Sequence, residues 1–486
     1  MRLFVLIYVF LVSSCTLGPK YNPPEICVAD KWSGINDVEK ETAIHSKWWE
    51  IFEDEFLTKY IQEAAKCNHS VLSAKANILE ARALRMVEVA KLLPHLSADF
   101  IGAEHYFSKN GLIFSIAEDV EAQADALSDF FDIEFPRQIS FFNAVIDASW
   151  EIDLFGKLRK GVEAQTAAVG SAIEQKNDLL ISIFAEVAIN YAELRSAQHK
   201  GKLLQEEVGL LEEKMLIEEE RFKFGYNDAV DVNEIEKQVA ELKSTLPKVY
   251  SEIYKNIYAI SILVGKPPEA LLKELLPFAE MLKLPDGVAI GLRSDLLRRR
   301  PDVRYAERLL AQSTALEGVA IASFFPTITF GGNVGFQALK LAKLFKGDSF
   351  TWTAGGDGNT PIFQGGKLLG NLNVARAKTL SNIHFYEQTV LMALQEAQSA
   401  LISYNNDLVA FERVNLAAEK QENIAYITKE KFVNGIINGI SFIEQERQLN
   451  LAEQNTLESQ TTALIDLISL YKSLGGGLTP CSEKED

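Results

Sequence analysis

The sequence contains an internal duplication at a fixed offset of 210 residues, and this repeat restricts the possible folds more than any other feature. The register holds without a gap over 110 positions. The matches are Gly156-Lys157 with Gly366-Lys367, Glu186 with Glu396, Arg221-Phe222 with Lys431-Phe432, Gly225 with Gly435, and Gly265 with Gly475. Such a register predicts two copies of one structural unit.

A second pair of related motifs lies upstream at a larger spacing. Leu93-Pro94-His95-Leu96 resembles Phe325-Pro326-Thr327-Ile328 at an offset of 232 residues. The first copy therefore has 22 more residues (232 − 210) between its proline and its glycine. We expect these residues in a loop from about Ser108 to Arg137, which is rich in acidic and aromatic residues. This loop is either a variable surface segment or a cap over a channel exit.

Each repeat is predicted to form a helix, a strand pair and two further helices. Ala, Glu, Lys and Leu at helical spacing, with prolines only at the ends, favour long helices. The predicted helices cover residues 55–92, 156–224 and 227–263 in the first repeat, and residues 294–323, 366–434 and 438–474 in the second. The two segments of 69 residues would each be about 100 Å long. Pro247 is expected to interrupt the helix that contains it.

The repeats also set the domain boundaries. The first repeat covers residues 55–265 with its strand pair at about 97–150, and the second covers 294–475 with its strand pair at about 327–362. The remaining segments are a signal peptide at 1–14, an N-terminal extended segment at 15–54, a linker between the repeats at 266–293 and a tail at 476–486.

The strand segments alternate between apolar and polar residues. The apolar positions include Phe142, Ile146 and Trp150 in the first repeat and Ile328, Phe330, Val334 and Phe336 in the second. Asn, Asp, Ser, Thr and Gly occupy the positions between them. This pattern is typical of a membrane barrel strand with lipid on one side and water on the other, although a half-buried soluble sheet has the same local pattern.

Four strands cannot close a barrel, because an open edge in lipid leaves backbone groups without hydrogen-bond partners. No later segment approaches eighteen consecutive apolar residues, so a membrane crossing would have to use strands. We therefore expect several copies to complete the barrel. Three copies would give twelve strands, an even number with room for a lumen.

The N-terminus has the features of a lipoprotein signal. An apolar run of ten residues, Leu3–Val12, is too short to span a bilayer and is followed by Ser13, Ser14 and Cys15. Small residues before a cysteine resemble a lipobox, so residues 1–14 should be removed. Cys15 should then carry diacylglycerol, N-acyl lipid and hence palmitate-type chains, which anchor the protein to a membrane. An Asp after the cysteine would resemble an inner-membrane retention signal, and Thr16 there favours the outer membrane.

Composition argues against nucleic-acid binding and offers no catalytic site. The chain has 49 basic and 67 acidic residues and a net charge of −18, whereas phosphate binding needs clustered Lys and Arg. The six histidines and the cysteines Cys27, Cys67 and Cys481 show no metal-ligand spacing, and no nucleophile elbow or phosphate loop is present. We therefore expect neither an enzyme nor a metal site, and no cofactor except the lipid on Cys15.

Six motifs in a fixed order make the chain similar to a known family. They are Cys15–Pro24, Trp48-Trp49-Glu50-Ile51-Phe52, Trp150–Lys157, Arg299–Arg304, Phe324-Phe325-Pro326, and Pro361-Ile362-Phe363 with Gly365-Gly366. Together they resemble the outer membrane factors, which include the TolC-like proteins, and within them the NodT-type efflux lipoproteins.

The resemblance implies a mainly α fold with a membrane β-barrel part. A homotrimer would form a twelve-stranded barrel in the outer membrane and a twelve-helix, coiled-coil periplasmic tunnel. It further implies a passive duct that exports small molecules or drugs. Its partners would be a periplasmic adaptor (membrane fusion) protein and an inner-membrane pump, expected to be of the RND type.

The resemblance also directs attention to the helix tips, where relatives narrow through rings of Asp. Gly225 and Gly435 mark the predicted turns. At the first tip, Asp228 and Asp231 are candidate gate carboxylates or, alternatively, helix caps. The second tip departs from the family pattern, because Ile436, Ile437 and Asn438 stand where Asp is expected. Ile436 and Ile437 could form an apolar constriction, or exposed apolar residues of the tip could contact the helical hairpin of the adaptor.

Two other functions remain open from the sequence. The same architecture could serve as the outer-membrane duct of a type I protein secretion system. A lipid-anchored, coiled-coil structural protein without a pore is a different class, but such a spacer has no reason to alternate aromatic and polar residues.

Overall fold

A computed structural model of the chain describes residues 16–23, 47–108, 110, 137–285, 287 and 293–477. Within these residues the fold is mostly helical with one four-stranded sheet, which confirms the predicted combination of long helices and four strands per chain. The described residues do not include Cys15, Cys27 or Cys481. They also do not include most of the acidic loop predicted between Ser108 and Arg137.

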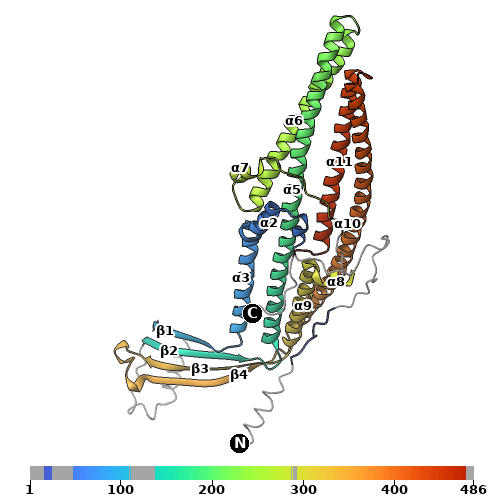
Figure 1. The fold of residues 1–486 in the computed structure, drawn as a ribbon. Helices are drawn as coiled ribbons and strands as arrows, with labels where there is room; N and C mark the ends of the chain where they lie inside the picture. The colour runs from blue at the N-terminus through green and yellow to red at the C-terminus, as the bar shows by residue number, and fades with distance from the viewer. Residues whose placement is uncertain are drawn as a thin grey trace, which may run out of the picture. The chain divides into compact units, whose positions relative to one another are not determined.

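The elements follow the predicted order (Figure 1). In the first half they are η1 (Trp48–Phe52), α2 (Glu55–Cys67), α3 (His69–Ala90), β1 (His95–Tyr106), β2 (Gln138–Ile152), α5 (Lys157–Lys223), α6 (Ala229–Leu263), η2 (Pro268–Leu271) and α7 (Leu272–Leu275). In the second half they are α8 (Arg293–Arg299), α9 (Pro301–Ala322), β3 (Thr327–Ala338), η3 (Leu341–Lys343), η4 (Gly347–Ser349), β4 (Phe350–Asn359), α10 (Lys367–Val433) and α11 (Gly439–Ser473).

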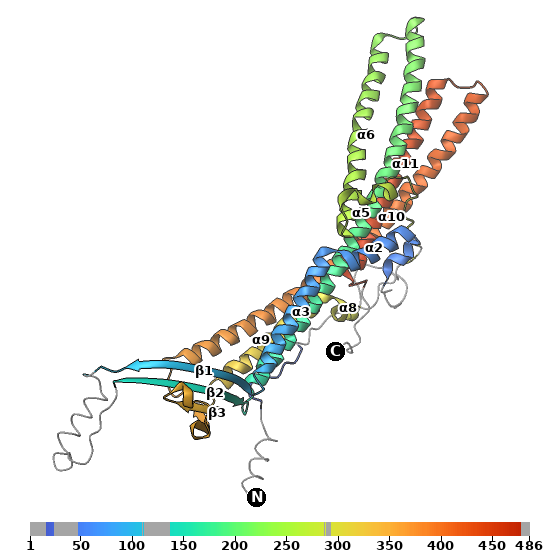
Figure 2. The same ribbon diagram turned by 90° about the vertical axis from the view of Figure 1, so that its left-hand side faces the viewer.

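The offset of 210 residues relates the long helices of the two repeats at both ends. Lys157 and Lys367 begin α5 and α10, while Ala229 and Gly439 begin α6 and α11. Each long helix has 67 residues and each returning helix has 35. Residues at this offset therefore occupy equivalent places in two helical hairpins, α5/α6 and α10/α11 (Figure 2).

Three local predictions about the helices need correction. The predicted helix 55–92 divides at Asn68, whose Oδ1 accepts hydrogen bonds from the N–H groups of Ser70 and Val71 and so caps a new helix. The predicted helix 294–323 divides before Pro301, which occupies the first position of α9. Pro247 does not interrupt α6, which runs through it. Buried Val249 and Ile253 help hold that segment in place despite the missing N–H.

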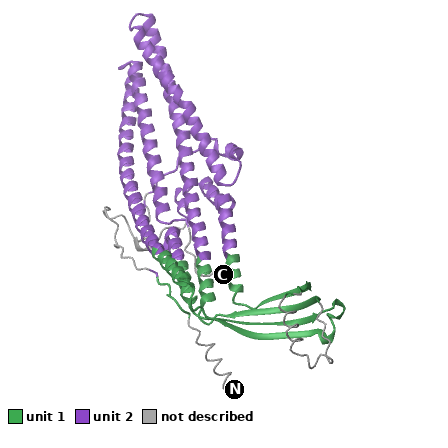
Figure 3. Cartoon of the chain, turned by 180° about the vertical axis from the view of Figure 1, so that it is seen from behind, with its two compact units in different colours: residues 1–22, 82–167, 311–380 green, residues 23–81, 168–310, 381–486 purple. Residues whose placement is uncertain are grey.

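The chain divides into two compact units, shown in Figure 3. Unit 1 comprises residues 1–22, 82–167 and 311–380, and it contains the sheet. All neighbouring strands are antiparallel, in the order β1-β2-β3-β4. Within the described strands β1 and β4 therefore form open edges.

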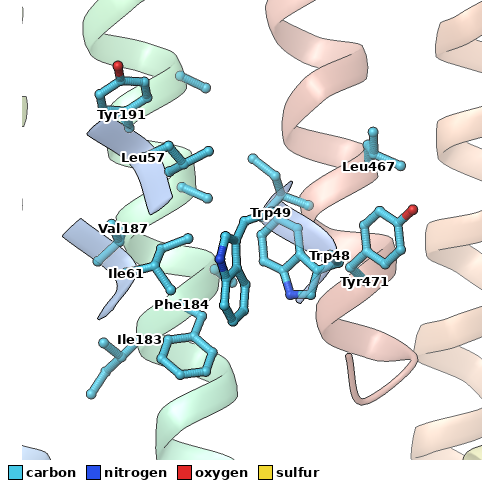
Figure 4. Packing of buried hydrophobic residues seen from close by; sticks show 14 of the residues in the cluster. Trp48, Trp49, Leu57, Ile61, Ile183, Phe184, Val187, Tyr191, Leu467 and Tyr471 are labelled. Carbon is cyan, nitrogen blue, oxygen red and sulfur yellow. The ribbon is translucent and has the colours of Figure 1, made fainter. Parts of the chain in front are cut away.

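Unit 2 comprises residues 23–81, 168–310 and 381–486 and contains the main hydrophobic core. Trp48 stacks on Tyr471 of α11 with ring centroids 5.4 Å apart, and Trp49 meets Phe184 of α5 edge-on at 5.1 Å (Figure 4). The short η1 segment thus joins the long helix of one repeat to the returning helix of the other. Aromatic pairs of this kind contribute about 0.5–1.5 kcal/mol beyond their burial.

Among the described residues, no helix is both long and apolar enough to cross a lipid bilayer.

Candidate functional site

The sheet presents one continuous apolar face. In the strand register Phe142 lies opposite Ala338, Ile146 opposite Val334, and Trp150 opposite Phe330. Because side chains alternate along a strand, all the predicted apolar positions project from the same face. They are Phe142, Ile146, Trp150, Ile328, Phe330, Val334 and Phe336. Ile146, Trp150, Phe330 and Val334 are exposed in the isolated chain.

The outer strands extend this face further than the sequence indicated. Phe100 of β1 lies opposite Ala144 and is 64% exposed, and Trp352 of β4 lies opposite Val334 and is 68% exposed. From the sequence, Ser97–Phe107 and Ser349–Ile362 are weaker strand candidates than the inner pair, and in the second of them small residues such as Gly356 and Gly358 interrupt the apolar alternation. The result is an apolar surface that extends across all four strands, and contiguous exposed apolar patches mark protein or membrane contacts.

The opposite face of the sheet is largely polar and acidic, with Ile101, Phe141 and Val145 among its apolar exceptions. One row across all four strands consists of Ser97, Asp147, Asn333 and Thr353. The four strands contain no Lys or Arg, whereas the polar face also carries Asp99, Glu151 and Asp357. A sheet with lipid on its apolar side would therefore present carboxylates to water on the other.

The residues that follow Cys15 are tied to unit 1. Leu17 N–H donates to Phe155 O over 3.2 Å, and the buried Lys160 Nζ donates to Pro19 O over 3.3 Å. Gly18 is required where the chain passes, because its φ is +105° and a β-carbon built on it would lie 2.6 Å from Gly318 Cα. Residues 16–19 therefore lie against Phe155 and the first turn of α5, next to the candidate lipidation site.

The two hairpin tips use the same turn. At the first tip Gly225 has φ +72°, its N–H donates to Phe222 O, and the N–H of Tyr226 donates to Arg221 O. At the second tip Gly435 has φ +70°, and Gly435 and Ile436 donate to Phe432 O and Lys431 O. This is the Schellman motif, in which glycine adopts the left-handed conformation that ends a helix. Gly225 and Gly435 thus lie where the sequence predicted the turns.

The candidate gate carboxylates of the first tip take part in helix capping. Asp228 Oδ1 accepts hydrogen bonds from the N–H groups of Val230 at 2.8 Å and Asp231 at 3.3 Å. Asp231 lies in the first turn of α6, where a negative charge is favoured by the helix dipole. Both side chains are exposed, so capping leaves them accessible to ions or to other copies of the chain.

The second tip replaces this arrangement with amide and apolar groups. Asn438 Oδ1 accepts from Ser441 N–H at 2.9 Å and caps α11. Ile436 is 70% exposed, whereas Ile437 is partly buried. Of the two candidate constriction residues, Ile436 is therefore the more accessible. The apolar tip residues that are at least 70% exposed are Phe224, Tyr226, Val230, Val433 and Ile436. Each tip therefore exposes apolar side chains.

Polar contacts connect the two hairpins behind the tips. Lys214 Nζ lies 3.2 Å from Glu444 Oε2, and Arg447 lies within 3.4 Å of both Glu444 and Glu207. Burial alone would raise the pKa of Glu444, but Lys214 and Arg447 lower it below its usual value. The contact between α5 and α11 at this level therefore includes ion pairs as well as amide hydrogen bonds, such as that of Gln454 Nε2 to Glu207 Oε2. Within the described residues no group of three His, Cys, Asp or Glu could hold a metal ion.

Comparisons with known proteins agree with this geometry. A family model described as "Outer membrane efflux protein" matches residues 60–265 and 292–476. The toluene efflux pump outer membrane protein TtgC of Pseudomonas putida is 26% identical over 474 residues, covering 96% of this chain and 94% of TtgC. Nodulation protein T of Rhizobium leguminosarum bv. trifolii is 24% identical over 479 residues, covering 97% of each chain. The solved structure of the outer-membrane channel OprN superposes with a TM-score of 0.84 at 26% identity, covering 95% of this chain and 99% of OprN.

Proposed function

Because this chain belongs to the outer membrane efflux protein family, we propose that it is the exit duct of a tripartite efflux system in the outer membrane. The duct exports small molecules or drugs passively from the pump or periplasm to the outside. The efflux channels among its relatives, TtgC and OprN, support this assignment. The matched family is a family of efflux proteins and not of enzymes, and we assign the chain no catalytic role.

The observation that carries this proposal is the open-edged sheet with its continuous apolar face. Phe100, Phe330 and Trp352 are exposed in the isolated chain, although each would be favourable in lipid. The backbone groups along the outer edges of β1 and β4 would be costly in lipid unless another strand paired with them. Three copies, with β4 of each paired to β1 of the next, would form a closed barrel of twelve strands. Its acidic inner face would be in contact with water.

The helical hairpins of the three copies form the periplasmic part of the duct. Twelve helices make a tunnel, and the hairpin tips control its inner end. Asp228 and Asp231 supply negative charge there, while Ile436 is available for apolar contacts. The exposed apolar tip residues provide the docking surface for a helical hairpin of the adaptor protein, and the inner-membrane pump is of the RND type.

Lipidation of Cys15 anchors the same protein to the outer membrane. Residues 16–19 are fixed next to the start of α5, so acyl chains on Cys15 would enter the membrane close to the strands of unit 1. The test is incorporation of a labelled fatty acid in the full-length protein, with Cys15→Ala as the control. Label that persists in Cys15→Ala would place the lipid elsewhere.

The assembly itself is tested by native mass spectrometry of the purified protein in detergent. The proposal predicts one species with three copies of the chain, which dissociates only when the barrel is unfolded by heating. A folded monomer with an intact sheet would contradict the proposal, because four strands cannot enclose a lumen. A secretion duct would give the same mass and would be distinguished by export of a polypeptide.

A further inference from the structure

The loop between β3 and β4 concentrates positive charge at one end of the sheet. The four strands contain no Lys or Arg, and the whole chain has a net charge of −18. This loop, residues 339–349, contains Lys340, Lys343 and Lys346 and one acidic residue, Asp348. It lies at the end of the sheet away from the helices, because β3 follows α9 and β4 leads into α10 (Figure 1). In an outer-membrane duct with a periplasmic helical part, this end faces the cell exterior, so we call residues 339–349 the outer loop.

Backbone hydrogen bonds place the three lysines on one side of the outer loop. The N–H of Lys343 donates to Lys340 O at 2.9 Å, and the N–H of Lys346 donates to Lys343 O at 3.1 Å. Residues three apart lie above one another in such 3₁₀ turns. Ser349 Oγ donates to Lys343 O at 2.8 Å, and the side chain of Leu344 is fully buried. The lysines therefore project from an ordered loop that Leu344 anchors.

The three ammonium groups have no partner within the described part of the chain. All three lysines are exposed, and none of their side chains forms an ion pair or a hydrogen bond with a described residue. Lys214 and Lys243, in contrast, lie 3.2 Å and 2.6 Å from carboxylate oxygens. Like charges on one side of a short loop repel one another, and an anion bound among them would relieve this repulsion.

The outer loop also carries apolar side chains on the lipid-facing side of the sheet. Phe345 is 71% exposed, and its ring meets that of Phe336 edge-on with centroids 5.7 Å apart. Phe336 belongs to the apolar face of the sheet, so Phe345 extends that face outward. Leu339 and Leu341 are exposed as well. Lysines beside exposed apolar groups are typical of segments that lie at the level of lipid headgroups.

The other strand hairpin has a cation next to an aromatic ring at the same end of the sheet. Arg137 directly precedes β2, and its guanidinium lies over the ring of Tyr106, 4.6 Å from the centroid. Tyr106 projects from the same face as Phe100, because side chains alternate along β1. Arg137 Nε is buried and has no hydrogen-bond partner among the described residues. Both strand hairpins thus bring a cation to the outer border of the apolar face.

We propose that the outer loop binds the phosphate groups of a phosphorylated lipid in the outer leaflet of the outer membrane. The three lysines contact the phosphate oxygens, and the exposed leucines and Phe345 contact the acyl chains. Arg137 supplies a further cation at the end of the other strand hairpin. The binding fixes the depth of the sheet in the membrane. It rests on the proposed function, because only a sheet inserted in the outer membrane brings this loop to the outer leaflet.

Charge and apolar contact together select this class of ligand. Free phosphate or another soluble polyanion would pair with the lysines but leave Phe345 in water. A lipid without phosphate would cover the apolar side chains and leave three ammonium groups unpaired at the membrane surface. A lipid with phosphate groups on its headgroup satisfies both sets of side chains.

The test is a titration of the purified full-length protein in nonionic detergent, followed by native mass spectrometry. The probes are lipid A with two phosphates and lipid A from which both phosphates have been removed. We expect tighter binding of the phosphorylated form. Lys340→Gln/Lys343→Gln/Lys346→Gln should weaken its binding by about 10- to 100-fold and leave binding of the dephosphorylated form unchanged. The corresponding triple Arg variant keeps the charge and should retain the affinity.

The matched control is Lys255→Gln/Lys420→Gln/Lys429→Gln. It removes the same charge from exposed lysines of α6 and α10, and it should leave the affinity for phosphorylated lipid A unchanged. Equal affinity for the two forms of lipid A, or an equal loss in the control variant, would overturn the proposal. It would also be overturned if the outer-loop Gln variant kept its lipid affinity but melted at a lower temperature without lipid. The lysines would then pair with acidic residues of another copy of the chain.

Single-channel conductance of the same samples in a bilayer of phosphatidylcholine separates this proposal from the proposed function. Conductance without phosphate-dependent lipid binding would retain the duct and remove the lipid site. Phosphate-dependent binding that is lost in the outer-loop Gln variant, in a protein that does not conduct, would retain the lipid site and remove the duct.

Discussion

Asp228 and Asn438 lie 210 residues apart and occupy the same position in the two repeats, where each side chain caps the returning helix of its hairpin. Asp228 Oδ1 accepts the N–H of Val230 at 2.8 Å, and Asn438 Oδ1 accepts the N–H of Ser441 at 2.9 Å. The second repeat therefore shows that an amide performs the capping role without a charge. This allows the capping role of Asp228 to be separated from any role of its charge.

Asp228→Asn should preserve the cap and remove the charge, whereas Asp228→Ala should remove both. We expect amide exchange at the start of α6 to be unchanged in Asp228→Asn and faster in Asp228→Ala, which loses about 1 kcal/mol of helix stability. Cation selectivity of the channel should fall in both variants. If selectivity falls only in Asp228→Ala, the effect comes from lost structure and the charge is not part of the gate.

The two faces of the sheet should respond differently to a charge. Val334→Arg places a cation on the apolar face, where it should cost about 2–4 kcal/mol near the middle of a bilayer. Asn333→Arg, one residue away, places the same group on the polar face and should be tolerated. The amount of heat-modifiable, folded protein in the membrane fraction measures both. Equal loss in the two variants would contradict the assignment of the faces.

Gly335 is a position where the sheet has no room for a side chain. A β-carbon there would lie 2.1 Å from Ala144 O and 2.6 Å from Val145 Cα, both backbone atoms of the neighbouring strand. Gly335→Ala should therefore displace β3 from β2 and reduce assembly of the folded protein. Gly355→Ala is the control, since no atom lies within 4 Å of its β-carbon. Normal assembly of Gly335→Ala would show that the strands can separate at this point.

A pair of carboxyl groups between α10 and α11 should make stability depend on pH. Burial, together with a hydrogen bond and repulsion from Asp407, raises the pKa of Asp466 to about 6. A raised folded-state pKa means that the stabilising contribution is complete at acid pH and is lost as pH rises through about 6. Asp466→Asn should therefore raise the unfolding temperature at pH 8 and have little or opposite effect at pH 4.

Asp407→Asn provides the matched control for this pair. It should give a similar gain at pH 8, and the double variant should gain less than the sum of the two, because both substitutions relieve the same repulsion. Additive gains would mean that the two carboxyl groups do not interact.

The sequence was sufficient to predict most of the fold because the repeat fixes equivalent positions. Prolines and glycines located the helix ends, and Gly225 and Gly435 ended their helices as expected since only glycine readily adopts a positive φ. Periodicity also placed Trp150 and Phe330 on one face. The periodicity is weaker in β1 and β4. In these strands small residues occupy several apolar-face positions on either side of Phe100 and Trp352.

Other features depend on contacts that a single sequence does not display. Pro247 was predicted to break its helix, but packing at Val249 and Ile253 maintains it. Whether Asp228 caps a helix or guards a channel could not be decided from its position in the turn. The structure shows the cap, while a guarding role depends on the approach of other copies of the chain.

Single-channel conductance of the purified full-length protein in a planar bilayer tests the duct most directly. The account predicts discrete, cation-selective openings, with selectivity reduced in Asp228→Asn/Asp231→Asn and with Cys15→Ala as the control for anchoring. A stable, membrane-bound trimer that never conducts, even with both tip carboxylates replaced, would contradict it and leave a lipid-anchored structural protein as the better description.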